Sequence, residues 1–151
     1  MKIVNISGGL GNQMFQYAFA LSLKNKNPQD KVLIDIQHYK SIFFKHYKGI
    51  NLHNGYEINK IFHGANLPVA RPLDLILVSW WIPNYVLSRI ARKFFPQRRT
   101  EYVEPFDNVF SYDHAVDNRE SSTYFEGYWQ CPMYFESIRE GLDKGYIQLV
   151  E

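Results

Sequence analysis

Residues 2–20 read KIVNISGGLGNQMFQYAFA, and this stretch decides the fold. Ile3, Val4 and Ile6 predict a short buried strand, because β-branched residues favour extended structure. The glycines that follow break this pattern and permit positive φ angles and a close approach of the backbone. From Met14 onward the apolar residues recur at helical spacing. We therefore predict a strand, a glycine-rich turn and a helix whose first amide groups favour an anion above the turn.

The glycine-rich turn sets two expectations. Asn12 is predicted to cap the N-terminus of the helix. A dinucleotide-binding oxidoreductase would carry the spacing G-x-G-x-x-G here, with its third glycine allowing the helix to pack closely on the strand. Counted from Gly9 and Gly11, that third position is Met14. The turn therefore suits an anion but departs from the dinucleotide pattern.

A βαβ unit is predicted from the segments that follow. Residues 24–30 are polar and rich in turn formers, and residues 31–36 form a second apolar run. Strand, helix and strand within about 35 residues imply a parallel sheet with a right-handed crossover. The expected fold class is α/β, a Rossmann-like parallel sheet with flanking helices. Ligands bind at the carboxyl ends of such strands, where Asp35 would bind a sugar hydroxyl or, more commonly, anchor a loop.

Later segments extend the sheet. Short strands are predicted at residues 101–103 and 108–110, and the best third strand lies in the aromatic segment 121–130. Pro132 is predicted to start a helix over residues 133–142. With 151 residues, the chain is long enough for one domain with a sizeable core.

Composition limits the classes of function. The net charge is only +2, and nothing indicates a nucleic-acid partner. Cys131 is the only cysteine, which rules out an internal disulfide and favours a reducing compartment. The sequence shows no signal-peptide pattern and no apolar run of the roughly 18–20 residues that a membrane helix needs. We therefore expect a cytoplasmic location.

The histidines do not predict a metal centre. Successive spacings of 8, 7 and 10 residues separate His38, His46, His53 and His63. Compact metal sites use shorter and more regular spacings. Structural or surface roles are expected for these side chains, and no metal or other cofactor is expected.

Residues 67–99 read as a basic, aromatic helical insertion. An apolar run reaches Trp80 and Trp81, and a helical period with a basic face follows over residues 86–95. One interpretation is an amphipathic segment that docks on an anionic membrane, which would place the protein peripherally at the inner face of that membrane. The other is an ordinary pair of helices with a solvated basic face, and it is the simpler one.

Two stretches resemble one enzyme family. The run GGLGNQMFQYAFA closely resembles the N-terminal signature of the bacterial alpha-1,2-fucosyltransferases, glycosyltransferase family 11. Residues 124–130, with Tyr134 and Phe135 after them, resemble a second family segment, in which a glycine-aromatic-aromatic-glutamine run leads into Ser-Glu-Lys-Tyr-Phe. Here Cys131-Pro132-Met133 replaces the polar triplet. That departure affects polar contacts at this point rather than the fold.

The resemblance implies a fold, a reaction and partners. Family members resemble two-domain GT-B glycosyltransferases and transfer L-fucose from GDP-fucose to the 2-hydroxyl of a terminal galactose, with inversion and without a required metal. Their C-terminal half carries a His-x-Arg-Arg-x-Asp motif that binds the GDP diphosphate. This chain lacks the motif, so residues 1–151 are expected to form a single N-terminal Rossmann-like domain. The C-terminal donor-binding domain would be a missing partner, and the chain alone would be inactive or weak, with its catalytic residues unassigned.

The resemblance also implies site residues. In the related protein O-fucosyltransferases a similar Gly-x-x-Gly-Asn-Gln loop faces the nucleotide sugar across the interdomain cleft. Carried over, the donor cleft would be lined by Gly8, Gly9, Leu10, Gly11, Asn12 and Gln13. Asn12 is the best single candidate for a hydrogen bond to the phosphates or the fucose, with helix capping as its other role. Weaker candidates for acceptor contacts are Asp35, Glu126, Tyr128 and Trp129, and for Trp129 core packing is the more common role.

Two alternative functions remain open at this point. The chain would be a non-catalytic remnant that binds a glycan or a nucleotide, or, less favoured because of Met14, a nucleotide-dependent oxidoreductase. Binding of galactosides, GDP or NAD(P)H separates them.

Overall fold

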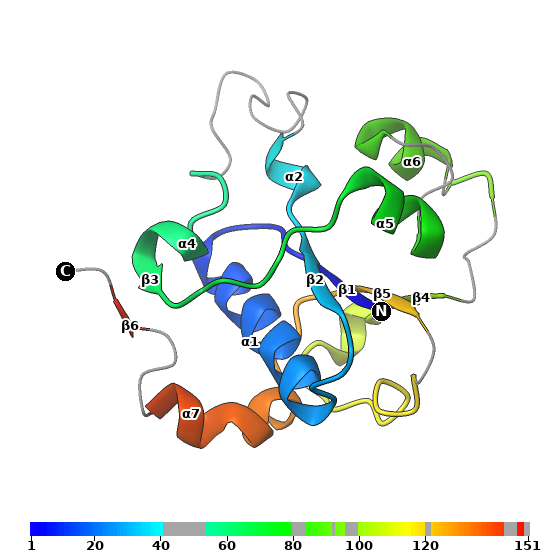
Figure 1. Ribbon diagram of the computed structural model, residues 1–151. Helices are drawn as coiled ribbons and strands as arrows, with labels where there is room; N and C mark the ends of the chain where they lie inside the picture. Colours follow the sequence, from blue (N-terminus) through cyan, green and yellow to red (C-terminus); the bar gives the residue numbers. More distant parts are fainter. Residues whose placement is uncertain are drawn as a thin grey trace.

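A four-stranded, all-parallel sheet forms the centre of the molecule (Figure 1). The strand order is β2-β1-β5-β4. These strands are β1 (Lys2–Asn5), β2 (Val32–Asp35), β4 (Glu101–Val103) and β5 (Thr123–Glu126). The expected α/β, Rossmann-like sheet is therefore confirmed. The computed structural model describes residues 1–40, 54–79, 84–91, 93–95, 100–119, 122–143 and 148–149.

Helices of very different length connect the strands. The longest, α1 (Leu10–Lys26), joins β1 to β2. A small antiparallel pair, β3 (Phe62–His63) and β6 (Gln148–Leu149), lies apart from the main sheet. The shorter α-helices are α2 (Gln37–Lys40), α4 (Ile58–Ile61), α5 (Pro72–Val78), α6 (Tyr85–Ala91) and α7 (Arg139–Asp143), and the 3-10 helices are η1 (Phe106–Asn108) and η2 (Pro132–Ile138).

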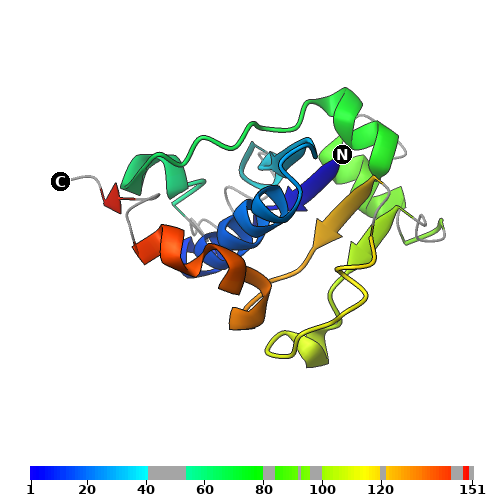
Figure 2. The same ribbon diagram turned by 60° about the horizontal axis from the view of Figure 1, so that its bottom comes forward.

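Helices cover both faces of the sheet because side chains alternate along each strand. Ile3 of β1 and Tyr124 of β5 pack on one face with Leu75 and Val78 of α5. On the opposite face, other strand residues such as Val4 pack with α1 and η2. Figure 2 shows α1 and η2 on one side of the strands and α5 with α6 on the other. The sheet is therefore sandwiched between two helical layers.

An aromatic cluster fills the core on the α1 side. The ring of Trp129 stacks on Phe19 with centroids 4.2 Å apart, and Phe125 and Tyr134 meet it edge to face. All four side chains are buried. Trp129 holds a φ of 56°, the positive-φ region that residues other than glycine rarely adopt. Packing of the large ring therefore fixes an unfavourable backbone at this position.

Several expected elements differ in detail from the structure. The helix begins at Leu10 with Gly9 as its N-cap, so the prediction of Asn12 as N-cap is wrong. The glycine turn allows the helix to start earlier than the first good capping side chain. The strand predicted at residues 108–110 is also wrong, because η1 ends there in a turn. The helix predicted after Pro132 is confirmed in position but starts as the 3-10 helix η2, with a kink at Phe135.

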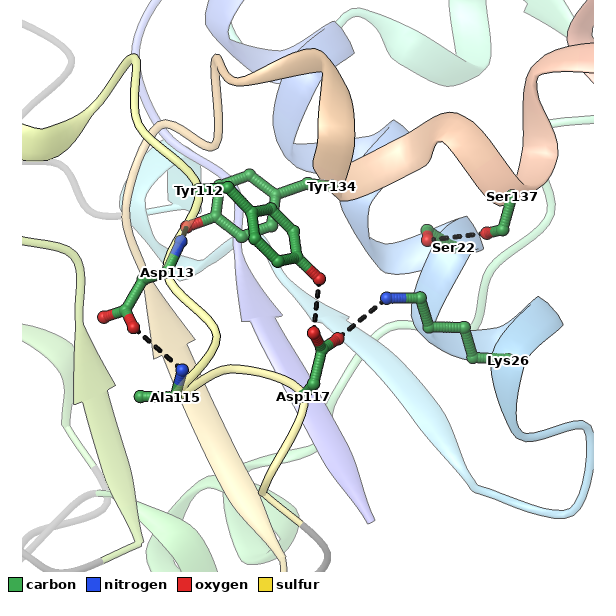
Figure 3. Close-up of polar contacts among 8 residues, drawn as sticks. All are labelled: Ser22, Lys26, Tyr112, Asp113, Ala115, Asp117, Tyr134 and Ser137. Carbon is green, nitrogen blue, oxygen red and sulfur yellow. Dashed lines mark hydrogen bonds and ion pairs between the residues drawn. The ribbon is translucent and has the colours of Figure 1, made fainter.

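The connection between β4 and β5 is held against α1 and η2 by polar contacts (Figure 3). Lys26 forms an ion pair of 2.8 Å with Asp117, which also accepts a hydrogen bond from the Tyr112 hydroxyl. Asp113 donates its backbone N–H to the Tyr134 hydroxyl at 3.0 Å. These contacts hold residues 111–117 over the aromatic cluster.

Among the described residues of segment 67–99 are the helices α5 and α6, and its description as an insertion stays a prediction. Asp74 of α5 is buried and accepts hydrogen bonds from Lys31 and Arg71. Burial by itself would raise the pKa of Asp74, but these bonds outweigh it and hold the pKa at about 2. Among the described residues, no helix combines the length and apolar character needed to cross a membrane. Trp80, Trp81, His46 and His53, named above, lie outside the described residues.

Candidate functional site at the carboxyl edge of the sheet

A pocket opens where the parallel strands β1, β4 and β5 end. Its volume is about 350 Å³, within the usual size range of small-molecule sites. From β1 the chain passes to β2 on one side, and the later strands are added on the other side. Open α/β sheets bind their ligands at such a reversal of strand order. The lining residues are Asn5, Ser7, Gly8, His38, Val103, Glu104, Phe106, Val109, Glu126, Gly127 and Tyr128.

The glycine turn forms the wall of the pocket that follows β1. Gly8 has a φ of +81°, and a Cβ added there would lie 2.8 Å from Nδ2 of Asn12. The Tyr39 hydroxyl donates a hydrogen bond of 2.6 Å to the Gly8 carbonyl. Position 8 therefore favours glycine for its backbone angle, and a larger residue there would also displace the Asn12 side chain.

Asn12 joins the two segments that resemble the fucosyltransferase family. Its Oδ1 accepts a hydrogen bond of 3.1 Å from Nε2 of Gln130, which follows β5. The side chain therefore points to the segment after β5 rather than capping α1. Asn12 is partly exposed, and its expected contact with a phosphate or a fucose stays a prediction.

Gln13 is buried, and its side-chain amide supports the glycine turn through hydrogen bonds. Its Nε2 donates to the carbonyls of Gly55 (2.8 Å) and Gly8 (3.2 Å). Its Oε1 accepts the backbone N–H of Glu57 at 2.9 Å. With three bonds made and no exposed surface, Gln13 supports the pocket without lining it.

Gln16 is a second buried amide, and sequence reasoning missed it. Its Oε1 accepts the Ser7 N–H at 2.9 Å, and its Nε2 donates to the Gly127 carbonyl at 2.8 Å. One side chain of α1 thus ties together the loops that follow β1 and β5. The sequence does contain a signal for this role, because Gln16 is a long polar residue next to Tyr17 and Phe19 on the same helix.

The acceptor candidates divide into two groups. Glu126 and Tyr128 line the pocket together with Gly8. Asp35 is fully buried and accepts hydrogen bonds from the Tyr124 hydroxyl (2.8 Å) and the Gln37 N–H (2.9 Å). Trp129 is fully buried in the aromatic cluster. The structure therefore brings only part of the expected set to the pocket; Gly9, Leu10, Gly11, Asn12, Gln13, Asp35 and Trp129 are not among its lining residues.

Glu104 is a carboxylate of the pocket that sequence reasoning missed. It follows β4, and its Oε2 accepts the backbone N–H groups of Tyr128 (2.7 Å) and Trp129 (3.1 Å). A Cβ on Gly127 would lie 2.6 Å from Cβ of Glu104, so the turn after β5 closes tightly around this side chain. Burial raises the pKa of the Glu104 carboxyl, opposed by those two N–H groups. The contact between Glu104 and the turn after β5 could not be predicted from the sequence, because the two segments are distant in the chain and meet only where β4 pairs with β5.

The described residues contain no group of three or more His, Cys, Asp or Glu side chains that could hold a metal ion. The pocket's described lining residues likewise include no lysine or arginine. The polar side chains among these described residues are two carboxylates, one amide, two hydroxyls and one imidazole.

Comparison with known proteins gives one informative match. No family model matches the chain, and no solved structure matches it. An alpha-1,2-colitosyltransferase of Escherichia coli is 25% identical over 142 residues, which cover 93% of this chain and 42% of that protein. The chain therefore spans less than half the length of this relative. Its similarity to a sugar-transferring enzyme, over nearly its whole length, supports a glycosyltransferase as the kind of protein to which it is related.

Proposed function

We propose that the chain is the acceptor-binding domain of a GT-B glycosyltransferase that transfers fucose from GDP-fucose to the 2-hydroxyl of a terminal galactose. The observation that carries this proposal is the pocket at the carboxyl edge of the sheet, in a chain similar to an alpha-1,2-colitosyltransferase. Resemblance of the glycine turn to alpha-1,2-fucosyltransferases supports the choice of sugar and linkage. Inversion would follow from direct attack of the galactose hydroxyl on the donor.

The chemistry of the pocket suits a hydroxyl-rich ligand. Carboxylate and amide oxygens accept hydrogen bonds from hydroxyls, and Phe106 and Tyr128 supply aromatic surface for the apolar face of a sugar. Glu104 and Glu126 would repel a diphosphate when ionised, and no lysine or arginine among the described lining residues offsets them. We therefore assign the acceptor to this pocket. The donor diphosphate would depend on a C-terminal domain that carries the His-x-Arg-Arg-x-Asp motif, with the N-terminal end of α1 beside it.

The alternatives make different demands on the chain. A non-catalytic remnant would bind a galactoside or GDP without supporting transfer. A dinucleotide-binding oxidoreductase would need a small residue at position 14, where α1 packs closely on β1. Position 14 here is Met14, whose side chain is 46% exposed. The glycine turn and helix α1 therefore give no support to dinucleotide binding.

The decisive experiment measures binding and transfer separately. We expect methyl β-galactoside to bind the 151-residue chain in an NMR titration, with shifts at Gly127 and Tyr128. Transfer from GDP-fucose should be at or near background until a C-terminal domain with the His-x-Arg-Arg-x-Asp motif is supplied in trans. GDP-colitose, whose sugar lacks the 3-hydroxyl of fucose, should be compared as donor. Absence of galactoside binding, or protection by NAD(P)H in a thermal shift assay, would contradict the proposal.

We propose further that the protein acts at an anionic membrane surface, through the outer face of α5 and α6. Leu73 and Leu77 of α5 are 69% and 71% exposed, and Phe94, after α6, is 80% exposed. Segment 67–99 contains six basic residues and one acid, and that acid, Asp74, is buried in ion pairs. Apolar side chains amid excess positive charge suit anionic lipid.

Vesicle sedimentation tests this proposal. The chain should bind vesicles containing about 30% anionic phosphatidylglycerol and release them as salt rises, because screening weakens the attraction. The double substitution Leu73→Ser with Leu77→Ser should weaken binding by about tenfold or more, since two exposed apolar side chains are lost. Phe110→Ser, which changes an exposed residue outside α5 and α6, is the matched control. Equal binding to neutral and anionic vesicles, or no binding, would exclude this membrane role.

A further inference from the structure

Two buried oxygen atoms of pocket residues have no hydrogen-bond partner in the part of the chain that the structure describes. They are Oδ1 of Asn5 and Oε1 of Glu104, whose residues are only 3% and 7% exposed. Asn5 ends β1, and Glu104 follows β4, so the two groups reach the pocket from different strands. A buried acceptor without a partner destabilises the fold, because it has lost its hydrogen bonds to water without replacement. A hydroxyl entering the pocket would recover that cost.

The surroundings of Glu104 hold its carboxylate in one orientation. Oε2 is taken by the N–H groups of Tyr128 and Trp129. The turn that supplies them is under constraint at both ends, by the close contact of Gly127 with Glu104 and by the positive φ of Trp129. Strained backbone around a buried carboxylate is a common feature of functional sites. Oε1 is thereby left as the oxygen of Glu104 that has no hydrogen-bond partner among the described residues, although it is itself buried.

We propose that Glu104 is the general base of the transfer, with Oε1 accepting the proton of the galactose 2-hydroxyl and Asn5 accepting a hydrogen bond from a neighbouring hydroxyl. This inference rests on the proposed function. In the step, the O–H bond of the acceptor breaks and its proton moves to Oε1. The acceptor oxygen bonds to the anomeric carbon of the donor, and the bond from that carbon to the diphosphate breaks. Its electron pair leaves with the nucleoside diphosphate, which balances the reaction.

The position of Glu104 matches the demands of a base. The raised pKa of its carboxyl gives the carboxylate a higher proton affinity than an exposed glutamate has. Its two N–H partners still favour the ionised form, so the group remains able to accept a proton. Asp35, the buried carboxylate at the end of β2, accepts a hydrogen bond on each of its oxygens, from the Gln37 N–H and the Tyr124 hydroxyl, and is therefore less suited to the role.

The test compares methyl β-galactoside with its 2-deoxy analogue as ligands of the 151-residue chain. If the 2-hydroxyl donates to Oε1, the wild type should prefer the galactoside by about tenfold, the value of a hydrogen bond to a charged group. Glu104→Gln places an amide N–H₂ where the free oxygen was, because Oε1 of the new glutamine must serve the two backbone N–H groups. The variant should then bind both ligands within about twofold. Glu136→Gln, an exposed residue of η2, should keep the wild-type preference.

A pH series on the wild type keeps the test valid if Glu104→Gln does not fold. The preference for the galactoside should be full above the raised pKa of Glu104 and should disappear as the pH falls through it, because the protonated carboxyl is a weaker acceptor. His38, Glu126 and Tyr128 also face this pocket, so the series is repeated in His38→Gln and Glu126→Gln, where the low-pH loss should persist. Tyr102 and Tyr134 interact with Glu104 but stay neutral, because their pKa values are raised.

The outcomes separate this inference from the proposed function. A wild-type chain that binds neither ligand would refute the acceptor pocket itself. A Glu104→Gln variant that keeps the tenfold preference would refute the role of Glu104 while leaving the pocket intact. Once a C-terminal domain restores transfer, Glu104→Gln should also lower kcat by at least about 100-fold. Unchanged kcat would exclude Glu104 as the base.

Discussion

Replacing Trp129 with alanine is expected to lower the free energy of unfolding by about 3–5 kcal/mol, the usual cost of removing a buried aromatic ring. The ring stacks on Phe19 and meets Phe125 and Tyr134, so the cavity would lie at the centre of the aromatic cluster. Urea unfolding followed by circular dichroism measures the loss. Phe110→Ala, which truncates an exposed ring, should change stability by less than about 0.5 kcal/mol.

Replacing Trp129 with glycine instead of alanine tests the cost of the positive φ angle at this position. Trp129 has a φ of 56°, which alanine adopts at a cost of about 1–2 kcal/mol and glycine adopts almost freely. Trp129→Gly should therefore be more stable than Trp129→Ala by about 1 kcal/mol, although it removes one more carbon atom from the core. The opposite order would mean that the backbone at this position relaxes once the ring is gone.

Replacing Gln16 with leucine is expected to lower the free energy of unfolding by about 3 kcal/mol. The substitution keeps the approximate volume but leaves the Ser7 N–H and the Gly127 carbonyl without their partner in a partly buried position. Each unpaired group costs about 1–3 kcal/mol. Gln29→Leu, in an exposed turn, is the matched control and should be nearly neutral.

The same substitution should also disturb the pocket. Gln16 fixes the loop after β1 relative to the loop after β5, and both loops line the pocket. Galactoside binding should therefore weaken in Gln16→Leu even below the temperature at which it unfolds, as measured by NMR titration. Unchanged affinity together with unchanged stability would show that the amide is dispensable.

Local patterns in the sequence were sufficient for much of the fold. Apolar β-branched runs predicted β1 and β2, and the aromatic segment predicted β5, because each strand is buried and rich in residues that favour extended structure. The βαβ order alone implied parallel pairing and a ligand site at the carboxyl edge. By contrast, residues 108–110 looked like a strand only because they contain valine and phenylalanine, and tertiary packing left them as a turn after η1.

Residues 2–20 show which features of the protein local sequence determines and which it does not. By itself it determined a strand, a glycine-rich turn and a helix, because these depend on neighbouring residues and on the freedom of glycine at positive φ. Only the tertiary structure decided the roles of the polar side chains in that helix. Asn12 accepts a hydrogen bond from Gln130, whereas Gln13 and Gln16 are buried and form hydrogen bonds with the backbone of other loops. Glu104 and Gly127 likewise meet only because β4 pairs with β5, since a contact between distant segments depends on strand register rather than on local pattern.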